Sequence, residues 1–182
     1  MRIKKALILI VCFMLTISLC GCEQVLKELE IGMKDLTKAW NANESIYEYG
    51  ECRLVITDGA NVMTEEEEKQ LATFLEPYCN KVDIDVLICT TNTASMSATK
   101  YGAAYISRFF PNGSEDNVSF VFDLYHKEWF VVWHGYLAEK MPDARAETAF
   151  DKGSPYFRKD QYAKGFQEMG KYLLTEISKI KK

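Results

Sequence analysis

One stretch, DIDVLICTT at residues 83–91, constrains the fold more than any other. After its acidic residues it becomes apolar and rich in branched side chains, with no regular alternation of polar and apolar positions. A run of this kind is typical of a strand buried on both faces, as in parallel sheets that helices cover on either side. It therefore predicts a layered α/β domain with residues 83–91 at its centre.

Segments of strand and helix type alternate around this run. The other strand-type runs are CRLVIT (52–57), NVSFVFDLY (117–125) and WFVVWH (129–134). One helix-type segment begins at Thr64, a second spans residues 98–110, and others fill the C-terminal third. Breaks are expected at Pro77 and at SPYF (154–157). The order β-α-β-α-β-β-α-α predicts a three-layer α/β/α sandwich with a small mixed sheet. Its first three strands are expected to be parallel and its fourth antiparallel.

Four consecutive glutamates, Glu65–Glu68, follow the first of these strands and raise the question of a metal or catalytic site. Thr64 stands at the N-cap position of the predicted helix, and Glu67 three residues later completes a capping box. Negative charge in the first turn is also favoured by the helix dipole. These carboxylates are therefore interpreted as a helix start on a solvated face.

The N-terminus resembles a bacterial lipoprotein signal. A basic MRIKK is followed by an uncharged run from Ala6 to Leu19, which is short for a membrane span and fits the apolar region of a secretory signal. LCGC at residues 19–22 resembles a lipobox, so a signal peptide over 1–21 and lipidation of Cys22 are predicted. The alternatives are an uncleaved anchor and a signal cut elsewhere. Residues 22–50 are expected to form the lipidated N-terminus and a partly helical tether, and residues 51–182 the domain, on the extracytoplasmic face of the cell membrane.

Charge and composition narrow the choice of partners. The chain is 48% hydrophobic, as expected for a globular protein, and carries 22 basic and 26 acidic residues. Removing the predicted signal takes away Arg2, Lys4 and Lys5 and no acidic residue, which lowers the formal net charge from −4 to −7. Nucleic acid is not expected as a partner, because binding it requires a basic face.

Three cysteines remain in the predicted mature domain, Cys52, Cys79 and Cys89. The chain has no CxxC motif, so neither a structural zinc site nor a thioredoxin-like motif is indicated. One disulfide in an oxidising compartment and three buried thiols both remain open, with the thiols slightly favoured.

Asp58 ends the first strand-type run. Ligands of open α/β sheets gather at the carboxyl ends of strands, which makes this residue a candidate ligand. An aspartate before Gly59 is equally typical of a turn in which the carboxylate bonds the backbone. Both interpretations stay open.

With the elements in order, residues 52–180 resemble the TPM domain family. The resemblance rests on four stretches in the family's order: VITDGANVMTEEEEKQL, EDNVSFVFDL, HGYLAE and SPYFRKDQYAKGF. They resemble its opening strand, aspartate and capped helix, its Asp-Asn-Gly stretch, its Gly-Tyr-Gly-Leu-Glu stretch and its Pro-Tyr-Phe segment. The fold that the resemblance implies is the same α/β/α sandwich.

The resemblance also implies a set of functions and site residues. Family members are extracytoplasmic or membrane-attached; some bind divalent cations, often calcium, some have a weak acid phosphatase activity, and others are accessory factors of membrane complexes. The matching positions are Asp58, Asp116, Asn117, Gly135, Glu139 and Asp143. Two residues depart from the pattern, because Val118 and Leu137 stand where the family has glycine.

Topology divides these candidates between two edges of the sheet. If the third strand is parallel to the first, Asp116 lies opposite Asp58, and the hairpin returns Gly135 and Glu139 to the Asp116 edge. A weak site for calcium or another divalent cation is therefore expected from Asp116, Glu139 and Asp143, with Asp83 or Asp85 nearby and Asp58 as a separate candidate. The leading functional hypothesis is a membrane-anchored lipoprotein whose domain binds a membrane protein or complex, and the alternative is a divalent-metal-dependent acid phosphatase.

Overall fold

A five-stranded mixed sheet is the centre of the computed structural model, which describes residues 44–49, 52–94, 98–109 and 116–181. The strands are β1 (Glu44–Tyr49), β2 (Cys52–Asp58), β3 (Asp85–Thr91), β4 (Asn117–Asp123) and β5 (Glu128–His134), and they lie in this order across the sheet. β2, β3 and β4 are parallel, whereas β1 and β5 pair antiparallel with their neighbours. The predicted signal peptide (1–21), Cys22 and the tether up to residue 43 lie outside the described residues.

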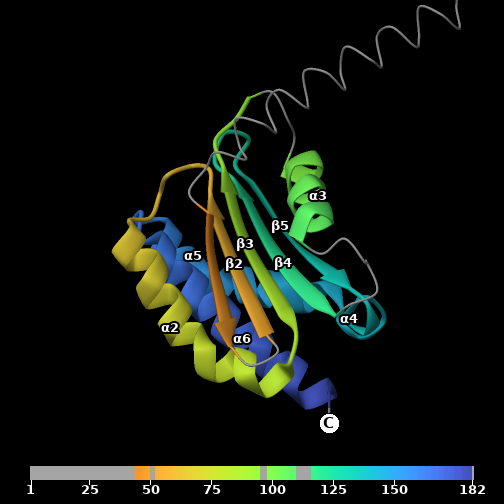
Figure 1. The fold of residues 1–182 in the computed structure, drawn as a ribbon. Helices are drawn as coiled ribbons and strands as arrows, with labels where there is room; N and C mark the ends of the chain where they lie inside the picture. The colour runs from red at the N-terminus through yellow and green to blue at the C-terminus, as the bar shows by residue number, and fades with distance from the viewer. Residues whose placement is uncertain (1–43, 50–51, 95–97, 110–115, 182) are drawn as a thin grey trace, which may run out of the picture. The chain divides into compact units, whose positions relative to one another are not determined.

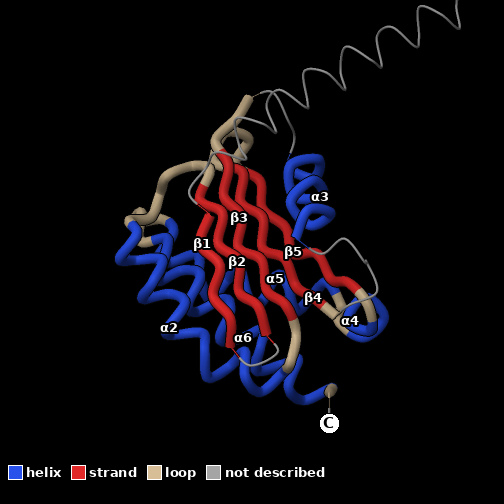
Figure 2. The backbone as a smooth tube through the Cα atoms, viewed as in Figure 1, coloured by secondary structure: helices blue, strands red, loops and turns tan. Residues whose placement is uncertain are grey.

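Helices cover the two faces of the sheet unequally (Figure 1). α2 (Glu65–Val82), α5 (Asp143–Phe157) and α6 (Tyr162–Ile180) lie on one face, and α3 (Ala98–Phe109) lies on the other. The short helix α4 (Tyr136–Lys140) follows β5 directly. This arrangement confirms the predicted α/β/α sandwich, and Figure 2 shows the strands as a continuous twisted sheet between the helical layers. None of the helices in the described part of the chain is long and apolar enough to cross a membrane.

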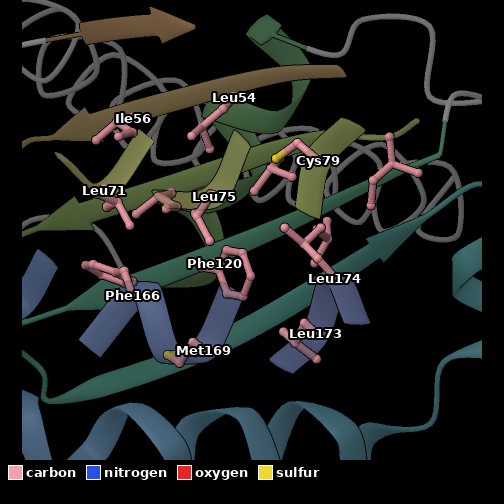
Figure 3. Close-up of a cluster of buried hydrophobic side chains, with 14 of the residues drawn as sticks. Leu54, Ile56, Leu71, Leu75, Cys79, Phe120, Phe166, Met169, Leu173 and Leu174 are labelled. Atoms are coloured by element: carbon pink, nitrogen blue, oxygen red, sulfur yellow. The ribbon is translucent and has the colours of Figure 1, made fainter. Parts of the chain in front are cut away.

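The main core lies between the sheet and the layer formed by α2, α5 and α6 (Figure 3). Alternate residues of β4, Val118, Phe120 and Phe122, belong to this core. The residues between them face α3, since a Cβ added at Gly102 of α3 would meet Val121 and Phe130. Every residue of β4 is buried, as expected for a strand covered by helices on both sides.

α2 begins as the sequence predicts but ends later. The Thr64 hydroxyl accepts a hydrogen bond from the Glu67 backbone N–H, and Glu67 returns the bond, so the capping box is present. Pro77 was expected to kink or end this helix, yet the helix continues to Val82. The turn after the proline carries Cys79 and Val82 into the core, and this burial outweighs the lost backbone hydrogen bond. The expected break at residues 154–157 lies slightly later, because α5 runs through Pro155 to Phe157 and α6 begins at Tyr162.

The predicted tether, residues 22–50, overlaps a strand that the sequence did not reveal. Glu44–Tyr49 forms β1 and pairs along its whole length with β2. The Ser45 hydroxyl of β1 donates a hydrogen bond to the Glu68 carboxylate of α2, whereas Ile46 on the other face is 53% exposed. The sheet therefore begins at Glu44, and the predicted boundary at residue 50 moves accordingly.

Candidate functional site

The amino edge of the parallel strands brings two of the predicted site positions together. Asp116 precedes β4, and its Oδ1 accepts a hydrogen bond of 2.6 Å from the backbone N–H of Tyr136, at the start of α4. Gly135 has a φ of +62°, and a Cβ at this position would overlap Asp116 Oδ1. The glycine is required both by its backbone conformation and by the close approach of the carboxylate. The expected return of the hairpin to the Asp116 edge is confirmed.

Cations of the chain itself neutralise this edge. Lys181 Nζ lies 3.2 Å from Asp116 Oδ2 and donates to the carbonyl oxygen of Asp83 at 2.9 Å. Asp85 is held by the Arg53 guanidinium, with 2.6 Å between Nη2 and Oδ2, and by the Arg53 backbone N–H. Of the carboxylates expected at a metal site, Asp116 is therefore engaged by a lysine and the nearby Asp85 by an arginine.

The remaining predicted ligands, Glu139 and Asp143, are exposed at α4 and at the start of α5. Across the described ranges, no three His, Cys, Asp or Glu side chains converge in a way that could hold a metal ion. Calcium requires six to eight oxygen ligands, so the residues at this edge do not fit a preassembled calcium site. The two departures from the family pattern have a structural explanation instead, because Val118 and Leu137 are both fully buried in the main core.

Asp58 lies at the opposite, carboxyl edge, as expected. Its side chain is buried; Oδ1 accepts a hydrogen bond from the Thr90 hydroxyl, and Oδ2 accepts one of 2.7 Å from the backbone N–H of Met63. Thr90 in turn accepts a bond from the backbone N–H of Ala60. Both carboxylate oxygens thus hold the β2–α2 connection against β3, which is the arrangement of a turn aspartate.

A pocket of about 310 Å³ opens at the carboxyl edge, where the β4–β5 hairpin meets α5 and α6. Its lining is mainly apolar and aromatic and comes from three segments: the end of β4 with the following turn and β5, one face of α5, and the first turn of α6. The lining residues are Phe122, Asp123, Leu124, Lys127, Glu128, Trp129, Phe150, Phe157 and Tyr162.

Ring contacts hold the walls of this pocket. Trp129 of β5 and Phe150 of α5 are stacked with 4.1 Å between centroids and an interplanar angle of 1°, and Phe157 lies 4.7 Å from Phe122. Cβ atoms at Gly153 and Gly165 would overlap the Phe157 ring, so these glycines make the room in which the ring sits. The aromatic walls are therefore positioned by packing rather than by exposed, mobile side chains.

Polar groups stand at the hairpin side of the pocket. The buried carboxylate of Asp123 accepts a hydrogen bond of 3.0 Å from the backbone N–H of His126 and lies 2.7 Å from His126 Nδ1. This contact fixes the turn and orients the imidazole, whose side chain is 34% exposed. Lys127, in the left-handed conformation with a φ of 58°, and Glu128 place charges of both signs beside the apolar lining.

Comparison with known proteins places the chain in a family. A family model described as the TPM domain matches residues 56–175, more than half of the chain. The chain belongs to the TPM domain family. No curated protein matches the sequence.

Two solved structures share the fold of this TPM domain. One is the NMR structure of the BA42 protein from the psychrophilic bacterium Bizionia argentinensis, with a TM-score of 0.57 and 11% sequence identity over 64% of this chain and 82% of that chain. The other is the N-terminal domain of a protein from P. gingivalis, with a TM-score of 0.54 and 16% identity over 69% of this chain and 80% of that one. At these identities the likeness concerns the fold alone.

The aromatic pocket of the TPM domain was not predicted from the sequence, although a signal for it was present. Two of the four stretches that resemble the family line the pocket: EDNVSFVFDL supplies Phe122, Asp123 and Leu124, and SPYFRKDQYAKGF supplies Phe157 and Tyr162. These stretches lie far apart in the chain and meet only because α5 and α6 pack under the β4–β5 hairpin. The aromatic residues of these two stretches were therefore the available clue.

Proposed function

We propose that this protein is a lipoprotein, anchored through Cys22 on the extracytoplasmic face of the cell membrane, whose TPM domain is a binding module for a membrane protein or complex. The observation that carries the proposal is the aromatic pocket at the carboxyl edge. Ligands of α/β sheets are found at this edge, and it is the edge where the described residues enclose an apolar space.

The pocket suits a large apolar side chain of a partner protein. Its volume of about 310 Å³ is at the lower end of the range for small-molecule sites, which leaves room for one or two side chains rather than a large ligand. Aromatic residues that bury such an anchor dominate the energetics of interfaces. Lys127 and Glu128 provide the polar rim that surrounds anchor pockets of this kind. Burial raises the pKa of the Tyr162 phenol, so its hydroxyl stays protonated and available as a donor.

A matched pair of variants tests this assignment. In a soluble Cys22→Ala form, Leu124→Arg places a charged side chain in the pocket, whereas Tyr125→Arg places the same charge on the neighbouring residue, which is 55% exposed and does not line the pocket. Both proteins are used to capture partners from detergent-solubilised membranes, and the captured proteins are quantified by mass spectrometry. We expect a partner that is retained by Tyr125→Arg and lost with Leu124→Arg. Equal capture by the two variants would show that the pocket is not the binding site.

The lipid anchor is tested separately at the N-terminus. Two acyl chains bury enough methylene groups to hold a protein stably at a bilayer, at about 0.8 kcal/mol per methylene. Mass spectrometry of the mature N-terminal peptide should show diacylglycerol on the Cys22 thiol. An unmodified Cys22, or a chain that starts at another residue, would remove the anchor from the proposal.

The alternative is a divalent-metal-dependent acid phosphatase. Family membership motivates it, and one feature beside the pocket favours it: the imidazole of His126, which does not line the pocket but is oriented by the lining residue Asp123. An imidazole held in this way can transfer a proton. Turnover of a generic phosphate ester by the purified protein, lost in His126→Ala or Asp116→Ala, would favour the enzyme. Turnover that persists in both variants would point to a contaminant.

A further inference from the structure

Two of the three cysteines of the domain meet in the main core. Cys52 is the first residue of β2, and Cys79 lies in the penultimate turn of α2. Because α2 connects two parallel strands, it runs back along the sheet, and its C-terminal end lies over the start of β2. Cys52 faces this helix together with Leu54 and Ile56, and Figure 3 shows Cys79 directed into the same cluster.

Both thiols are buried, with exposures of 2% for Cys52 and 0% for Cys79, and they lie close enough for the Cys79 thiol to be the main cause that raises the pKa of Cys52. Cys89 of β3 stands apart from them. It does not belong to the core cluster that contains the other two, and it lies beside Thr57 in the register of β2 and β3, on the face that α3 covers. Of the three pairings that three cysteines allow, the fold thus favours one.

We propose that Cys52 and Cys79 form a disulfide in the mature protein, which joins the start of β2 to the end of α2. The inference rests on the extracytoplasmic location proposed above, because disulfides persist in oxidising compartments. In the reaction the two thiols lose two protons and two electrons and form one S–S bond. The electrons pass by thiol–disulfide exchange to a second disulfide, of a small molecule or an oxidase protein, which is reduced to two thiols.

Burial decides when this bond can form. The contact with the Cys79 thiol, together with burial, raises the pKa of Cys52, so the reactive thiolate is scarce once the core has closed. Burial likewise raises the pKa of Cys89, to about 12. Oxidation therefore takes place while the chain folds, and the finished disulfide is sheltered from reductants in solution. This is the behaviour of a structural bond rather than a regulatory one.

The tryptic map of the chain provides a direct test. Cleavage after Lys38, Arg53, Lys69 and Lys81 places Cys52 in peptide 39–53 and Cys79 in peptide 70–81, with one cysteine in each, and Cys89 in peptide 82–100. The protein is isolated from membranes of cells treated with N-ethylmaleimide, denatured in the same reagent and digested without reduction. We expect one linked peptide made of 39–53 and 70–81, and a modified thiol on Cys89. Cys89→Ser should retain the linked peptide, and Cys52→Ala should abolish it.

A second arm separates the two ways in which the proposal can fail. A separate preparation, never exposed to N-ethylmaleimide, is reduced, denatured and refolded in a mixture of reduced and oxidised glutathione. If peptides 39–53 and 70–81 are modified as free thiols in the native sample, the disulfide proposal is overturned. Linkage that then forms in glutathione assigns the failure to the proposed location, whereas its absence assigns the failure to the geometry. Where the disulfide is present, its reduction should lower the thermal midpoint by roughly 10 °C, since it closes a loop of about 28 residues.

Discussion

The carboxylates at the two edges of the sheet differ in burial and in their bonding partners. At the amino edge, Asp116 and Asp85 are partly exposed and are paired with the side chains of Lys181 and Arg53. At the carboxyl edge, Asp58 and Asp123 are buried and accept hydrogen bonds from their own turns. At the amino edge, acidic residues that were candidates for a metal site form ion pairs within the protein. The second edge used its carboxylates to shape loops, and these loops frame an apolar pocket.

This contrast predicts that the buried carboxylates are structurally more important than the exposed ones. Asp58→Ala would leave the backbone N–H of Met63 and the hydroxyl of Thr90 without their acceptor in a buried turn. We expect a loss of about 3 kcal/mol in the free energy of unfolding. Asp116→Ala, at a carboxylate whose side chain is 21% exposed, should cost about 1 kcal/mol. Urea denaturation measures both, and equal losses would contradict the comparison.

The next effect concerns the backbone of the amino edge. Gly135→Ala introduces a Cβ at a φ of +62° and against Asp116. Strain of this kind costs about 2 kcal/mol. The control is Gly59→Ala, at an exposed glycine of the carboxyl edge, which should change the free energy of unfolding far less. A similar loss in both variants would mean that the contact with Asp116 is not what requires the glycine.

Calcium sharpens the comparison at the amino edge. Because Lys181 occupies one oxygen of Asp116, millimolar calcium should leave the thermal midpoint of the wild-type protein almost unchanged relative to chelator. Lys181→Ala frees that oxygen but brings no further ligands together, so calcium should shift the midpoint of this variant no more than that of the wild type. A large shift in the wild type, abolished by Asp116→Asn, would instead restore the metal site that the sequence predicts.

The smallest effect is a pH dependence near the carboxyl edge. Burial raises the pKa of Glu68 in α2, partly opposed by the hydrogen bond that the Ser45 hydroxyl donates at 2.6 Å. The contribution of Glu68 to stability is therefore present below its ordinary pKa of 4.5 and is lost as the pH rises through the raised value. Glu68→Gln keeps the acceptor and has no charge to bury. Its thermal midpoint should exceed that of the wild type at pH 7, and the difference should shrink as the pH is lowered towards 4.

The elements with local signals were predictable from the sequence. The apolar run of residues 83–91 indicates β3, and the capping box of Thr64 and Glu67 indicates the start of α2. β1 has no such signal, because ESIYEY is a charged edge strand whose identity comes from pairing with β2. Pro77 and Pro155 are tolerated inside helices because core packing overrides the local preference.

The candidate sites were predictable only in part. Topology placed Asp58 and Asp116 at opposite edges, and it brought Gly135 to Asp116. Asp116 forms an ion pair with Lys181, near the C-terminus, and nothing in the sequence around either residue indicates that contact. The same holds for the pocket, where Trp129 meets Phe150 only after α5 has docked on the hairpin. Sequence periodicity identifies faces and ends of elements, whereas contacts between distant elements depend on how they pack.

The antiparallel direction of β1 determines where the chain enters the domain. Glu44 pairs with Thr57, so the segment that leads back to Cys22 leaves from the carboxyl edge, the edge that also carries the pocket. Fully extended, residues 22–43 span at most about 75 Å. With the lipid anchor proposed at Cys22, the domain would be confined to a small volume above the bilayer, in which the proposed membrane partner would be present at an effective concentration on the order of a millimolar. Under that proposal, a pocket that binds a single side chain weakly would still be occupied for much of the time, because the partner would already be concentrated near it.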